Sequence, residues 1–274
     1  MNGVLAQLVA LTCHGNAFLA NPPETRFFPT NSTCQFCERV TFATMRTGFF
    51  GKSKETEVAR DPDSWFAQFK SRGALGFRLS RAPQNNPGIP DRMSAAFVGG
   101  GGSWTLEVLL PRGESEFWTA RWEVGDQQAA DKRIWRVTYV RVAVGKSQPF
   151  SARQLSECLR ELEDSLKETR AFSATQNLDG FTKCFDDALD AIGTRGRNRH
   201  GHHQDLAPAG FLSEDAAILL DACQTSWVFG GMGSWNDLGF DGDEQKTYDR
   251  VSERLFQAVN LAIEQAATSS MKGG

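Results

Sequence analysis

Hydrophobic and polar residues alternate with a period of two through much of the first half of the chain. In the segment 116–124, Trp118 and Trp122 fall on one face while Arg121 and Glu123 fall on the other, as in a half-buried strand. Such segments follow one another too closely for crossover helices, which favours an antiparallel sheet of five or six strands. The pattern predicts strands at 37–45, 74–80, 93–98, 104–110, 116–124 and 133–144.

A single short helix interrupts these strands. The segment 61–69 begins with Asp61, a good N-cap, and Pro62, which suits the first helical position. The segment 81–92 holds three prolines, two asparagines and a glycine, so it is a predicted loop.

After residue 150 the hydrophobic period changes to about 3.6, which is typical of amphipathic helices. Ser151, Asn177 and Ser213 are expected to cap the first three of four helices. Helices are predicted at about 151–168, 177–193, 213–229 and 243–267.

These elements indicate an α+β fold: an N-terminal antiparallel sheet of about five or six strands, followed by about four C-terminal helices packed on it. The sheet-rich part is residues 1–150 and the helical part is residues 151–274. The junction at 145–150 is too short for a flexible linker. We therefore expect a single domain that spans residues 1–274.

The composition favours a globular protein, with 40% hydrophobic and 23% charged residues. No stretch approaches the roughly 18 consecutive apolar residues that a membrane-spanning helix needs. The N-terminal segment 1–13 lacks the basic residues of a signal peptide. We expect a cytoplasmic protein that does not enter a membrane, with its six cysteines present as thiols.

The net charge of −3 is unevenly divided. Residues 1–150 hold 18 basic and 13 acidic side chains, and residues 151–274 hold 12 and 20. This division suggests halves that attract each other or surfaces with different partners. A greater use of Asp and Glu on helical surfaces is the simpler explanation.

The segment 224–244 places three glycines among aromatic residues and then runs into four carboxylates. Glycine backbone and tryptophan rings together suit a ligand or partner site. The same glycines, with adjacent turn-forming residues, also favour a hinge between two helices whose aromatic side chains enter the core. For a binding site, the candidate residues are Trp227, Phe229, Trp235, Asn236, Asp237 and Asp241.

Two segments carry candidate metal ligands. Cys34 and Cys37 have the spacing of half a tetrahedral zinc site, which Cys13 would help complete, but there is no second pair of this kind. The segment 195–205 is rich in histidine and arginine, and a solvated loop is the alternative to a site there. Its candidate metal ligands are His200, His202 and His203, and its candidate nucleic-acid contacts are Arg195, Arg197 and Arg199.

No nucleophile elbow, zinc-protease motif or dinucleotide fingerprint occurs in the chain. We therefore expect a binding or interaction protein, of an accessory or immunity-like kind, whose partner is another protein. One alternative is a metal-dependent hydrolase or nuclease-like enzyme that joins the 200–203 histidines to carboxylates such as Asp205 and Asp237. Another is a small structural zinc site at Cys13, Cys34 and Cys37.

Overall fold

The computed structural model describes residues 1–47, 53–84, 88–95, 100–147, 149–196 and 201–271. Six strands form one sheet in the order β2-β1-β6-β5-β4-β3. All neighbours are antiparallel except β1 and β6, which run parallel, so the sheet is mixed rather than wholly antiparallel. The strands are β1 (Cys37–Thr47), β2 (Ser53–Ala59), β3 (Gly76–Ala82), β4 (Ser103–Leu110), β5 (Glu114–Val124) and β6 (Trp135–Lys146).

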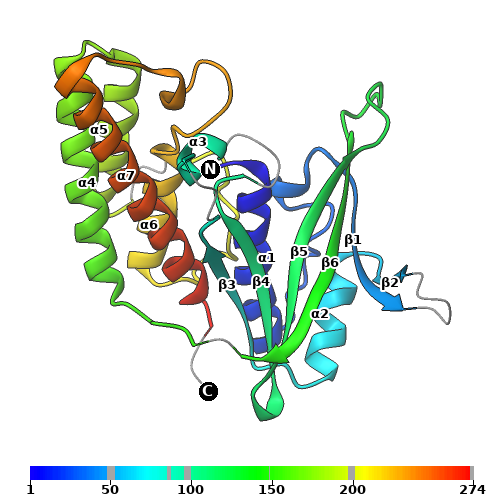
Figure 1. Cartoon of the computed structure of the whole chain (residues 1–274). Helices are drawn as coiled ribbons and strands as arrows, with labels where there is room; N and C mark the ends of the chain where they lie inside the picture. Colours follow the sequence, from blue (N-terminus) through cyan, green and yellow to red (C-terminus); the bar gives the residue numbers. More distant parts are fainter. Residues whose placement is uncertain (48–52, 85–87, 96–99, 148, 197–200, 272–274) are drawn as a thin grey trace.

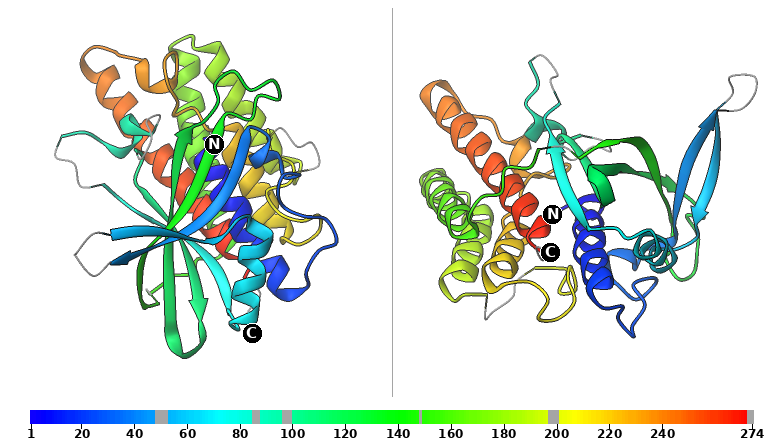
Figure 2. Two further views of the ribbon diagram at one scale, coloured as in Figure 1. Left: turned by 90° about the vertical axis from the view of Figure 1, so that its right-hand side faces the viewer. Right: turned by 90° about the horizontal axis from the view of Figure 1, so that it is seen from below.

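Helix α1 lies between the sheet and the C-terminal helices (Figures 1 and 2). It contacts β3 and β4 on one side and α7 on the other, while α2 packs near β1 and β2. The predicted α+β fold with four C-terminal helices is confirmed. The α-helices are α1 (Gly3–Ala20), α2 (Pro62–Ser71), α3 (Asp91–Ser94), α4 (Leu155–Thr175), α5 (Asp179–Gly193), α6 (Glu214–Thr225) and α7 (Gly242–Thr268). Short 3-10 helices are η1 (Ser32–Cys34), η2 (Pro111–Gly113) and η3 (Trp235–Asp237).

One hydrophobic core cluster includes residues from the sheet, from α1 and from the C-terminal helices. On the sheet side it is strongly aromatic. The Trp65 ring of α2 stacks on Phe42 of β1 at 4.2 Å and meets Trp118 of β5 edge-on at 5.3 Å. Such ring pairs add to the stabilisation that burial alone provides.

Helix α1 corrects the sequence analysis, which predicted no element there and no segment apolar enough to span a membrane. By length and composition alone, Gly3–Ala20 is a helix that could cross a membrane, with a mean hydropathy of 1.4. In this structure 67% of it is buried inside the protein. Core helices of soluble proteins and signal sequences share these properties.

Side chains from two helices cover the open edge of β3. Asn16 of α1 accepts a hydrogen bond from the Phe77 N–H at 2.7 Å and donates to the Phe77 carbonyl at 2.8 Å. The Thr268 hydroxyl of α7 does the same for Leu79, at 3.3 and 3.2 Å. These side chains occupy the positions that a seventh strand would otherwise fill.

Several local predictions differ from the structure. The strand β2 was not predicted, because its sequence is mostly polar and has only one large apolar residue, Val58. The predicted strand 93–98 is wrong at its start, where α3 extends to Ser94, and residues 96–99 lie outside the described part. Asn177 does not cap α5, since it adopts a positive φ of 54° and the helix begins two residues later.

Helix α4 begins at Leu155 rather than after Ser151. The Ser151 carbonyl accepts from Gln265 Nε2 at 3.2 Å, and the Arg153 N–H donates to Gln265 Oε1 at 3.0 Å. These bonds to α7 hold the segment outside the helix. The predicted caps Asp61 and Ser213 are confirmed.

Candidate functional site

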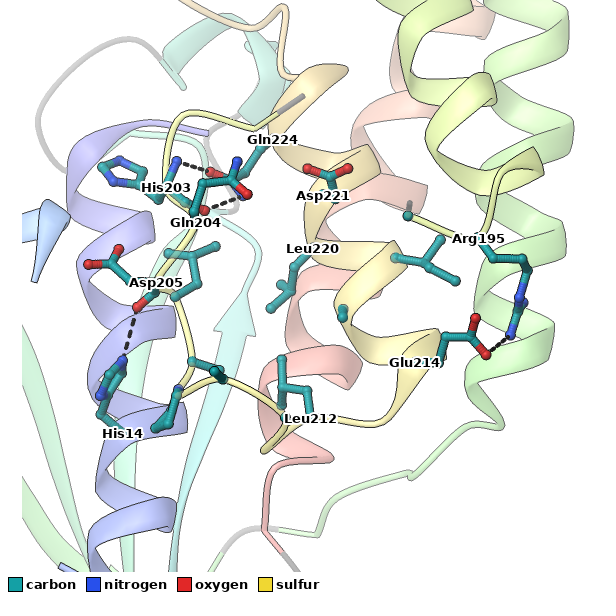
Figure 3. Close-up of a pocket in the computed structure, with 18 residues that line it drawn as sticks. His14, Arg195, His203, Gln204, Asp205, Leu212, Glu214, Leu220, Asp221 and Gln224 are labelled. Atoms are coloured by element: carbon teal, nitrogen blue, oxygen red, sulfur yellow. Dashed lines mark hydrogen bonds and ion pairs between the residues drawn. The ribbon is translucent and has the colours of Figure 1, made fainter. Parts of the chain in front are cut away.

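A pocket of about 560 Å³ lies between α6 and the segment 203–212. His14, His203 and Asp205 lie on the α1 side of this pocket, and Arg195 and Glu214 lie on the opposite side (Figure 3). The part between them is lined mainly by apolar side chains: Leu206, Ala207, Pro208, Leu212, Ile218 and Leu220. An apolar lining with a few polar groups is typical of small-molecule sites.

Helix α6 holds one wall of the pocket through two polar side chains. Gln224 accepts from the His203 N–H at 3.0 Å and donates to the His203 carbonyl at 3.1 Å. Asp221 accepts from the Gly201 N–H at 2.9 Å. A Cβ at position 201 would lie 2.6 Å from Gln224 Nε2, so only glycine allows this close approach without a shift.

The other side of the same segment is held by Ser32 at the start of η1. The Ser32 N–H donates to one carboxylate oxygen of Asp205 at 2.7 Å, and the Ser32 hydroxyl hydrogen-bonds the other. The same hydroxyl lies 2.7 Å from Nδ1 of His203. A carboxylate only accepts, so the hydroxyl donates its single proton to Asp205 and accepts from His203. His203 therefore carries its proton on Nδ1, and its Nε2 is an acceptor.

His14 of α1 contacts the backbone of the same segment. Its Nε2 lies 2.9 Å from the Asp205 carbonyl and therefore donates to it, and Asn31 Nδ2 donates to that carbonyl at 2.8 Å. Burial lowers the pKa of both His14 and His203, although the Asp205 charge opposes the shift. Both rings are neutral near pH 7.

This arrangement differs from a Ser-His-Asp triad. In a triad the carboxylate binds the histidine and the histidine binds the serine, so that the serine becomes a nucleophile. Here both Asp205 oxygens bind Ser32 directly. The ring of His203 and the carboxylate of Asp205 point away from α6 (Figure 3). The network fixes the pocket wall.

The three cysteines of the predicted zinc site do not come together. Cys34 Sγ and Cys37 Sγ each lie 3.6 Å from Gln7 Nε2, whereas Cys13 Sγ lies 4.0 Å from the Ala267 carbonyl of α7. Burial raises the pKa of Cys34 to about 12 and of Cys37 to about 11, so both remain protonated thiols. Across the described ranges, no three His, Cys, Asp or Glu side chains are grouped so that they could hold a metal ion.

The histidine- and arginine-rich segment 195–205 contributes Arg195, His203 and Asp205 to the pocket lining, a role that the sequence analysis did not predict. His202 is exposed, and His203 is part of the hydrogen-bond network. Arg195 pairs with Glu214 at 3.0 Å and with Asp215 at 2.8 Å, so two carboxylates share its charge. The other three candidates, Arg197, Arg199 and His200, lie outside the described residues.

The aromatic side chains of the segment 224–244 pack into or against the core. Phe229 and Trp235 are fully buried, and Trp235 Nε1 donates to Ser252 at 2.7 Å. Trp227 is half-buried and packs against Phe229 and Phe256. This geometry favours the hinge interpretation.

Two of the polar candidates in that segment have structural partners. Asp237 completes a capping box with Ser234, whereas Asp241 occupies the N-cap position of α7 without a side-chain capping hydrogen bond. Asn236 Nδ2 donates to the Arg92 carbonyl at 2.7 Å. None of these three lines the pocket beside α6.

The sequence analysis did not identify Ser32 or Gln224 as residues of the site. No local motif could have done so, because Ser32 lies 171 residues from His203 in the chain. No protein-family model matches the chain, and no curated protein or solved structure is significantly similar to it.

Proposed function

We propose that this protein is a binding protein and that the pocket between α1 and α6 receives a small, largely apolar molecule. The observation that carries the proposal is the pocket of about 560 Å³ whose wall segment is hydrogen-bonded from both sides. A pocket held in shape before binding spares the ligand the cost of ordering its walls. Buried thiols suit a reducing compartment, so a cytoplasmic location is part of this proposal.

The lining indicates the ligand chemistry. Leu212, Ile218 and Leu220 offer apolar contact in the middle, while the Arg195–Glu214 ion pair lies at one side. The Ser32 N–H and hydroxyl both hydrogen-bond the Asp205 carboxylate, so no histidine accepts the hydroxyl proton to activate Ser32. This arrangement favours binding over nucleophilic catalysis. A compact apolar body with one polar group at its end fits this distribution.

The test uses a panel of phenyl and cyclohexyl compounds that carry an amine, a hydroxyl or a carboxylate. Binding is followed by saturation-transfer NMR on the purified protein. The half-buried Ala217 lines the pocket, so Ala217→Trp should fill it and abolish binding. The control Ala171→Trp, on the exposed side of α4, should bind as the unaltered protein does. Failure of every compound to bind, or equal binding to the Ala217→Trp variant, would refute the proposal.

A further inference from the structure

A second concave surface lies where the segment 88–93 meets α7. It is an open groove of about 660 Å³. Ile89 is 59% exposed and Met93 is 37% exposed, so two large apolar side chains of this groove face solvent. Exposed apolar side chains gathered in a groove are typical of interaction surfaces.

A buried arginine forms part of the groove. Arg92 is only 4% exposed, and its guanidinium group lies 5.2 Å from the centre of the Tyr248 ring. One terminal nitrogen donates to Asp249 Oδ1 at 2.6 Å. Its Nε has no hydrogen-bond partner and lies 3.9 Å from Glu253 Oε2, which is also without one. Because 3.9 Å is too long for a hydrogen bond, Arg92 neutralises Glu253 only weakly.

The charge of this groove is negative. The side chains of Asp249 and Glu253 are 51% and 42% exposed, and in the described structure they share the single Arg92 guanidinium. The neighbouring Arg81 is already paired with Asp91. Two half-exposed carboxylates against one buried cation leave an excess of negative charge beside the apolar side chains. This combination is complementary to an apolar residue that is flanked by lysine or arginine.

We propose that this groove docks a short segment of a partner protein in which a Leu, Met or Phe is flanked by basic residues. The apolar side chain packs against Ile89 and Met93. A neighbouring ammonium or guanidinium group lies against the partly exposed carboxylates of Asp249 and Glu253 and balances their charge. The groove shares no lining residue with the pocket beside α6, so this proposal does not depend on the ligand proposed there.

The probes are two pools of fluorescein-labelled, acetylated and amidated heptapeptides. In one pool a Leu, Met or Phe is flanked by Arg or Lys; in the other, the flanking residues are Asp or Glu. Fluorescence anisotropy should show binding of the basic pool to the full-length protein, weakening as salt rises because the contacts are exposed. The acidic pool should not bind.

Surface variants separate docking from misfolding. Asp249→Asn combined with Glu253→Gln should weaken binding of the basic pool about tenfold or more, equivalent to about 1.4 kcal/mol. Met93→Ser should also weaken it, whereas Asp243→Asn, in the exposed first turn of the same helix, should not. Ala217→Trp should leave peptide binding unchanged, which keeps this test independent of the ligand pocket.

Three results would overturn the proposal. The first is no binding of the basic pool at about 1 mM, the weak end of specific recognition. The second is equal binding of the two pools, or binding that the Asp249/Glu253 variant retains. The third is a concentration-dependent dimer in sedimentation that Asp249→Asn abolishes, because the occupant would then be a second copy of this chain.

Discussion

At the scale of single residues, Asp205 connects elements that are far apart in the chain. Its carbonyl accepts from His14 and Asn31, and its carboxylate accepts twice from Ser32. A hydrogen-bonded network of this kind stabilises one arrangement of the pocket wall more than isolated bonds would. Because the network includes His14 and His203, the stability of that wall also depends on pH.

We expect His14→Gln to reduce the pH dependence of stability. Burial lowers the pKa of His14 in the folded state, against opposing charges on Asp205 and Asp63. The unfolded chain, with a pKa of about 6.5, then binds more protons than the folded one. The contribution of neutral His14 to the free energy of unfolding is therefore complete above about pH 6.5. It declines as the pH falls toward the pKa of His14 in the folded protein.

Urea unfolding at about pH 7 and about pH 5 measures this decline. The loss of unfolding free energy should be smaller in His14→Gln than in the unaltered protein. His202→Gln, at an exposed position, serves as the control and should behave like the unaltered protein. An unchanged decline in His14→Gln would show that other groups control the pH dependence.

At the scale of elements, the segment between α6 and α7 is held by an aromatic cluster. Trp235 lies 5.2 Å from the Phe181 ring and 5.4 Å from Phe185, and it is fully buried. Trp235→Ala should lower the free energy of unfolding by about 3–5 kcal/mol, because it opens a cavity in the core. Met232, fully exposed on the same segment, is the control, and Met232→Ala should change it by less than about 0.5 kcal/mol. Denaturant titration measures the free energy of unfolding of both variants. Equal losses would show that Trp235 does not anchor the segment in the core, which would contradict the hinge interpretation.

The covered edge of β3 leads to a second prediction at this scale. Asn16→Ala leaves the Phe77 N–H and carbonyl buried without partners, and each orphaned group costs about 1–3 kcal/mol. We expect a loss of about 2–6 kcal/mol in unfolding free energy and faster amide hydrogen exchange at Phe77. Gln128→Ala, at an exposed loop position, should leave both unchanged. Unaltered exchange at Phe77 in Asn16→Ala would show that the edge is protected by something else.

Sequence patterns predicted elements well where local chemistry decided the outcome. Asp61 and Ser213 cap their helices through their own side chains, as expected. The same reasoning was wrong at Ser151, because Gln265 holds that segment from a distant helix. Helix α1 has apolar residues around most of its circumference, so it lacked the one-sided period that reveals amphipathic helices.

At the scale of the whole molecule, the fold class was predictable and the candidate site was not. The change of hydrophobic period after residue 150 indicated a sheet followed by helices. The hydrogen-bond network of the pocket wall, however, combines Ser32 and His14 from the first part with His203 and Asp205 from the second. Contacts over 171 or more residues have no signature in one sequence, since they depend on how complete elements pack.

The central position of α1 has a consequence for the order of events during synthesis. Asn16 donates to Ser270 Oγ at 2.8 Å, across a separation of 254 residues. At about 5–20 residues per second, a ribosome needs roughly 13–50 s to add that length of chain. Helix α1 is therefore synthesised well before α7, the helix that packs against it. Until α7 has been made, the apolar side chains of α1 that face α7 have no partner, so the core between these two helices forms only late in synthesis.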